Sequence, residues 1–356
     1  MGMRKQRWWR APITREILVF MPVYAWLSFI NYAIKLRLTY SWSTLLESNH
    51  AALLNFKYTN NEQSRLLQFY IPEAIHQVFG ATIEHSYAVA RLLFVFMTFV
   101  FFHRYLRNWF SAAAAFAGVV LLAAIMPFSH VDDLQESSPL LGLLFLLGLW
   151  AIRDNHIPLM VFSFLAGGLT NETMMILPSV YFFYHLKFGT WRGFVAPAAR
   201  ACLAGLPLIV TLGPIRYYNR HCPHLGGGFH WPDNLRGIMG ELSVNPLDMA
   251  FTSYLWFIIF FGIAWYYMLL GYWESPLFLR RASWMIPFFI LAHLITGKIN
   301  EPRQMIPLAF IVIPMAMVYI CGYVKRTSTS VEMMSASAAP LEDVPGVAQA
   351  SPFADP

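Results

Sequence analysis

Long apolar segments separated by short polar links constrain this chain more than any other feature of its sequence. Hydrophobic residues make up 57% of the 356 residues and charged residues only 12%, about half the charged fraction of a soluble domain. A run of about 20 apolar residues crosses a bilayer as a helix, because a helix satisfies its backbone hydrogen bonds internally. We therefore expect an all-α, polytopic membrane helix bundle. The candidate segments are 17–34, 87–102, 110–128, 140–152, 157–184, 201–215, 249–272, 282–296 and 305–323.

The segment 157–184 is expected to be a hairpin of two short helices. Basic residues flank it at both ends, at Arg153 and Lys187, so an even number of crossings keeps both on one side. Each half has about 14 residues, which reach only ~20 Å of the ~30 Å hydrocarbon core. The expected apex is 167–173, with Pro178 in the returning arm. The bundle then has about nine to ten membrane segments.

Basic residues are concentrated in alternate links. One set of links, with both chain ends, holds 15 Lys and Arg against seven Asp and Glu, whereas the other set holds 10 against 12. Cytoplasmic loops carry an excess of Lys and Arg, so the net charge of +6 indicates orientation rather than a nucleic-acid partner. We expect an integral protein of a bacterial inner (plasma) membrane with both termini cytoplasmic. Its parts are a basic N-terminus at 1–16, a transmembrane domain at 17–325 with outward loops at 39–86, 129–139, 216–248 and 297–304, and a disordered tail at 326–356.

Glu172 is the only charged residue within 157–184. An ionisable group at membrane depth usually faces a wet cavity or a charged partner, because burying it alone is unfavourable. Since the hairpin apex is expected to point outward, Glu172 is expected to line an outward cavity and to position a substrate. The alternative is a carboxylate that is simply solvated at the surface of the apex.

The short outward loop at 129–139 carries three acidic residues. Asp132, Asp133 and Glu136 could supply oxygen ligands to a divalent cation, or a carboxylate that activates an acceptor. Alternatively, they could stabilise the N-terminus of the next helix, where the helix dipole favours negative charge. No other metal ligand set is predicted.

Several basic or polar residues in the outward loops could bind an anionic substrate. Glu301 and Arg303 could hold a headgroup phosphate together with Lys298, or pair only with each other. Arg91 could reach the same anion or extend its side chain to the interface. Two more candidates are Arg65, in an amphipathic piece at 64–76 that is expected to lie in the interface plane, and His130.

Together these features resemble the GT-C superfamily, the polytopic glycosyltransferases that use polyprenyl-phosphate-linked sugars. The resemblance covers about residues 15–325. It begins with a first segment followed by a long outward loop (17–86) and an acidic second outward loop. It continues with a small-residue turn before an apolar run with proline, Ala166-Gly167-Gly168-Leu169-Thr170-Asn171-Glu172 leading to Leu177-Pro178, and with an arginine before a proline-containing segment, Glu301-Pro302-Arg303-Gln304-Met305-Ile306-Pro307.

The resemblance implies transfer of a sugar from a polyprenyl-phosphate donor to a glycan, lipid or protein acceptor at the outer face of the membrane. The phosphate of the donor would lie near Arg303, Lys298 or Arg91. The catalytic base would be Asp132, Asp133 or Glu47, because the first outward loop lacks the Asp that the family usually places there. The one cofactor expected is a divalent cation at Asp132, Asp133 and Glu136.

Two other functional classes fit the same sequence. A lipid or solute transporter would also place a carboxylate beside broken helices at membrane depth, although the chain shows no pair of related halves. A non-catalytic membrane subunit would explain the missing Asp, with the outward loops as a docking surface.

Overall fold

The computed structural model describes residues 15–38, 42–58, 61–130, 137–220, 229–242 and 254–337. Their regular structure is entirely helical, and six stretches of it are long and apolar enough to cross a membrane. These are α1 (Arg15–Leu38), α4 (Ile83–Leu106), α5 (Ala112–Ile125) with η3 (Met126–His130), α9 (Trp191–Tyr218), α13 (Leu277–Ala282) with α14 (Met285–Thr296), and η6 (Pro302–Met305) with α15 (Ile306–Ser337). The expected all-α bundle is therefore confirmed, with six candidate membrane spans among the described residues where nine to ten membrane segments were expected.

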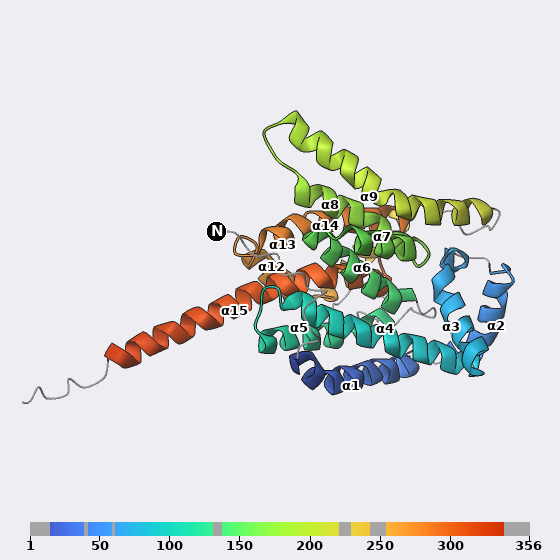
Figure 1. Ribbon diagram of the computed structural model, residues 1–356, viewed down its shortest axis with the longest axis horizontal. Helices are drawn as coiled ribbons and strands as arrows, with labels where there is room; N and C mark the ends of the chain where they lie inside the picture. Colours follow the sequence, from blue (N-terminus) through green and yellow to red (C-terminus); the bar gives the residue numbers. More distant parts are fainter. Residues whose placement is uncertain are drawn as a thin grey trace, which may run out of the picture.

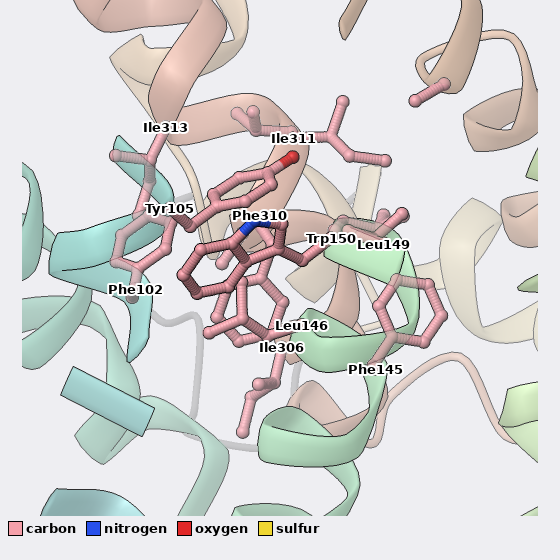
Figure 2. Packing of buried hydrophobic residues seen from close by; sticks show 14 of the residues in the cluster. Phe102, Tyr105, Phe145, Leu146, Leu149, Trp150, Ile306, Phe310, Ile311 and Ile313 are labelled. Atoms are coloured by element: carbon pink, nitrogen blue, oxygen red, sulfur yellow. The ribbon is translucent and has the colours of Figure 1, made fainter. Parts of the chain in front are cut away.

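Two apolar helices form the centre of the bundle. Every residue from Ser138 to Ile152 in α6 (Ser137–Asp154) is buried, and so is every residue from Met305 to Met317. The peripheral helices instead expose apolar side chains, as expected of surfaces that face lipid. Helix α1 exposes Val19 and Trp26, and α9 exposes Leu203 and Val210. Figure 2 shows the centre, where α4, α6 and α15 pack through Phe102, Tyr105, Phe145, Leu146, Leu149, Trp150, Ile306, Phe310, Ile311 and Ile313.

The segment 157–184 is a hairpin, as predicted. Its arms are α7 (Ile157–Gly168) and α8 (Leu177–His185), joined by the short turn η4 (Glu172–Ile176). Pro178 lies in the first turn of α8, where a missing backbone N–H removes no helical hydrogen bond. Asn171 caps the start of η4, and its Oδ1 accepts a hydrogen bond of 2.9 Å from the Thr173 backbone N–H.

The ends of several helices meet at one end of the bundle, which we call the basic end. There Arg107 Nε lies 2.8 Å from Glu16 Oε1, and Arg153 donates a hydrogen bond of 2.7 Å to Asn108. Arg281 donates to the Leu186 carbonyl just after α8, and Tyr184 lies within electrostatic reach of Arg153. The hairpin therefore enters and leaves at the same end of the bundle.

The link between α1 and α4 contains α2 (Trp42–Leu54), η2 (Asn61–Ser64) and α3 (Leu66–Phe79). Figure 1 shows α2 and α3 running across the direction of α1 and α4, as expected of helices in the interface plane. His50 joins them to α4, because its Nε2 lies 2.9 Å from Glu73 Oε2 and its Nδ1 lies 3.0 Å from the Tyr87 hydroxyl. The hydrogen bond with His50 lowers the pKa of Glu73 below its ordinary value.

The structure departs from the predicted segments at 249–272 and after residue 323. The segment 249–272 is not one helix, because α11 (Trp256–Ile259) and α12 (Ile263–Leu270) are separated at Gly262, whose φ of 48° favours glycine. The break is tolerated because α12 packs along α15. After residue 323, α15 continues to Ser337 and projects from the bundle (Figure 1), so residues 326–337 of the expected disordered tail are helical. No proline interrupts them, and residues 338–356 lie outside the described ranges.

Candidate functional site

Glu172 lies between two arginines from distant parts of the chain. Its Oε1 is 3.4 Å from Arg65 Nη2 and 3.5 Å from Arg216 Nη2. The Glu172 side chain is 32% exposed. It is therefore an ion-paired carboxylate rather than a group that is simply solvated at the apex.

Backbone contacts hold Arg65 at the hairpin apex. Arg65 immediately precedes α3, and its N–H donates to the Glu62 carbonyl at 2.9 Å. The next turn is joined to the hairpin, because the Leu67 N–H donates to the Leu169 carbonyl at 3.1 Å. The neighbouring turns η2 and η4 both pack against α9, which carries Arg216 in its last turn. The first loop and the hairpin apex thus form one structural unit.

Glu301 and Arg303 form a second ion pair at the same end of the bundle. Arg303 Nη2 lies 2.9 Å from Glu301 Oε2, and Gln304 Nε2 donates to the same oxygen at 2.9 Å. The two residues therefore pair with each other, which is one of the two alternatives that the sequence predicted. Glu301 also lies within electrostatic reach of Arg65, which connects the pair to the hairpin apex.

We call these five residues the Arg/Glu cluster: Arg65, Glu172, Arg216, Glu301 and Arg303. Burial alone would raise the pKa of Glu301. Arg303, with the hydrogen bond from Gln304 and the charge of Arg65, outweighs burial, so the pKa of Glu301 lies below the ordinary 4.5. With both carboxylates charged, three guanidiniums leave the cluster one net positive charge.

Asn234 fixes the turn that leads to Glu301. It lies in α10 (Trp231–Leu242), is buried, and donates to the carbonyls of Leu294 at 2.8 Å and Gly297 at 2.7 Å. Its Oδ1 accepts a hydrogen bond of 3.2 Å from the Ile299 N–H. The Asn234 side chain thereby satisfies backbone groups at the end of α14 and attaches α10 to the turn that leads to Glu301.

Sequence reasoning did not single out Arg216 or Asn234. Arg216 follows the segment 201–215 on its predicted outward side, so a search for charged residues at segment ends would have found it. His293 in α14 stacks on Phe289, with ring centroids 4.2 Å apart. It also lies within electrostatic reach of both Glu172 and Glu301.

The other predicted site residues fall in several places. Glu47 is exposed on α2 and Lys298 is exposed on the turn after α14. Arg91 is only 1% exposed within α4, so it does not extend to the interface. The backbone of His130 ends η3, which packs against η6 and so against the turn that carries Arg303.

The predicted acidic loop cannot be compared with the structure, since Asp132, Asp133 and Glu136 lie outside the described residues. Within the described ranges, no three His, Cys, Asp or Glu side chains are grouped to hold a metal ion. Comparison of the chain with protein-family models, curated proteins and solved structures finds no match.

Proposed function

We propose that the chain is a membrane glycosyltransferase that takes a sugar from a polyprenyl-phosphate donor, with the Arg/Glu cluster as the binding site of the donor phosphate. The observation that supports this most is the convergence of three guanidiniums at one end of a membrane bundle. Guanidiniums bind phosphate oxygens through paired, charge-assisted hydrogen bonds. A sugar-phosphate diester carries one negative charge, which the net charge of the cluster balances.

The surroundings of Glu172 support the likeness to the GT-C superfamily. That family often has a lysine after the small-residue turn, where this chain has a carboxylate. Arg65 and Arg216 both contact Glu172, so the group of three still carries one positive charge. A phosphate approaching the apex therefore meets a positive field despite the carboxylate.

In the proposed reaction the acceptor oxygen attacks the anomeric carbon of the donor sugar. The bond from that carbon to the phosphate oxygen breaks, and the phosphate leaves with the electron pair. The guanidiniums stabilise the negative charge that develops on it. One carboxylate takes the acceptor proton, and the candidates are Glu47, Asp132 and Asp133. The last two follow η3, which packs beside Arg303 on η6.

We place the Arg/Glu cluster at the outer face of a plasma membrane and the basic end in the cytoplasm. Arg107, Arg153 and Arg281 gather at the basic end, as the positive-inside rule requires of cytoplasmic loops. The donor lipid would then lie in the outer leaflet with its phosphate at the cluster.

The test is transfer of sugar by the purified full-length chain. Wild type is given a panel of polyprenyl-phosphate hexoses with acceptors from a membrane extract, and released polyprenyl phosphate is measured. A general base contributes about 100-fold to 10,000-fold, so we expect a loss of that size in at least one of Glu47→Gln, Asp132→Asn and Asp133→Asn. Glu84→Gln, an exposed carboxylate at the start of α4, is the control.

The outcomes separate the candidate functions. Full activity in all three variants would show that none of these carboxylates is the base. Donor binding without transfer of any sugar by wild type would indicate a non-catalytic subunit. Uptake of solute into sealed vesicles that depends on Glu172 would indicate a transporter instead.

A further inference from the structure

The contacts between Glu172 and its two arginines are incomplete. Both arginines approach the same oxygen, Oε1, at 3.4 and 3.5 Å, whereas charge-assisted hydrogen bonds are usually about 2.7–2.9 Å long. The other oxygen, Oε2, is buried and has no hydrogen-bond partner among the described residues. The buried Nε of Arg65 also lacks one there. One acceptor of Glu172 and one donor of Arg65 therefore have no hydrogen-bond partner among the described residues.

A phosphate group has the chemistry to take the place of the carboxylate between the two arginines and to accept a hydrogen bond from Arg65 Nε. It carries negative charge, as the carboxylate does, and it offers more acceptor oxygens in a tetrahedral arrangement. We propose that Glu172 is an internal anion that occupies the phosphate position between Arg65 and Arg216 and is displaced when a lipid-linked phosphate binds. This inference rests on the proposed function only for the identity of the ligand.

The structure gives Glu172 two features that displacement requires. First, its backbone is fixed independently of the ion pair, because Asn171 caps η4 and η4 packs against α9. Second, its side chain is partly exposed, so the carboxylate can rotate toward water without movement of the hairpin. While the ligand is absent, the carboxylate separates two guanidiniums that would otherwise repel each other.

An internal anion also makes the site selective. An incoming ligand must replace the contacts of Glu172, and inorganic phosphate has only its charge with which to do so. A polyprenyl phosphate gains in addition from transfer of its apolar chain into the membrane beside the site. Competition with Glu172 therefore disfavours soluble anions more than lipid-linked ones.

The test is a binding measurement on the full chain in nanodiscs of uncharged phosphatidylcholine. The probes are farnesyl phosphate and inorganic phosphate. In Glu172→Gln the competing charge is absent, so farnesyl phosphate should bind about tenfold tighter than to wild type, a change of about 1.4 kcal/mol. Inorganic phosphate should displace farnesyl phosphate from this variant at concentrations that have no effect on wild type.

Two variants serve as controls. Glu84→Gln changes the net charge by the same amount at an exposed position of α4, and its affinity should equal that of wild type. Arg216→Gln removes one of the two guanidiniums that contact Glu172, and it should weaken binding of farnesyl phosphate about tenfold. Together they separate a local effect at the apex from a general effect of charge.

The proposal is overturned if Glu172→Gln binds farnesyl phosphate no more tightly than wild type does. If that variant does not fold, Glu172→Asp replaces it: its shorter carboxylate holds the guanidiniums less well, and an affinity at or below wild type is then the contradicting result. Tighter binding by Glu172→Gln without sugar transfer by wild type would refute the proposed enzyme and leave the internal anion standing. Sugar transfer by wild type without tighter binding by Glu172→Gln would support the proposed enzyme and refute the internal anion.

Discussion

Glu172 is paired with guanidiniums that its local sequence does not reveal. The isolated position of Glu172 in an apolar segment was enough to predict that it has a partner or a wet surrounding. Its partner Arg65, however, is 107 residues away in the chain. Only the packing of the first loop on the hairpin brings the two together. By contrast, the pairing of Glu301 with Arg303 is local, and the sequence did predict it as one alternative.

The lowered pKa of Glu301 makes stability depend on pH. Its pKa in the folded chain lies below the ordinary 4.5, so the unfolded chain takes up the proton first as pH falls. The stabilisation is therefore complete well above pH 4.5 and is lost as pH falls below that value toward the folded pKa. We expect the melting temperature of the detergent-solubilised chain to fall in this acidic range.

Glu301→Gln isolates this contribution. At pH 7 the variant should lose about 1–3 kcal/mol, because Arg303 and Gln304 lose a charged acceptor. Below pH 4.5 its melting temperature should approach that of wild type. An equally steep acidic decline in both proteins would show that Glu301 contributes nothing to it.

At the scale of elements, the close approach of α7 and α9 sets the position of Glu172 relative to Arg216. A Cβ added at Gly168 would lie 2.0 Å from Thr211 Oγ1 and 3.2 Å from the Leu208 carbonyl of α9. The sequence predicted the hairpin from its flanking charges and length. It did not predict which helix the apex would contact, because small residues permit close packing without specifying the partner.

Gly168→Ala should therefore separate the two helices. We expect a loss of about 1–3 kcal/mol from overpacking and weaker binding of farnesyl phosphate, since Arg216 would move away from the apex. Adding Thr211→Ala removes the closest clashing atom, so it should restore part of the lost stability and part of the lost affinity for farnesyl phosphate. Gly213→Ala is the matched control on α9, because its added Cβ meets no atom within 4 Å. Equal stability and affinity in wild type and Gly168→Ala would contradict this role.

At the scale of the whole molecule, apolar segment length and charge alternation predicted most of the bundle. They failed where tertiary packing replaces segment continuity, as at Gly262, where α12 lies against α15 instead of continuing as a single helix. They also did not predict which helices are most deeply buried in the bundle. The most central helices are α6 and α15, whereas α1 exposes Val19 and Trp26. Hydrophobicity alone does not separate a helix that faces lipid from one that faces other helices.

The measurement that tests the account most directly is a cryo-electron microscopy structure of the full chain with a bound polyprenyl phosphate. We predict phosphate density within hydrogen-bond distance of Arg65 and Arg216 and beside Arg303, with the Glu172 carboxylate turned away from the two guanidiniums. Phosphate bound elsewhere in the molecule, with the Arg/Glu cluster unchanged, would contradict the assignment of the cluster as the donor site.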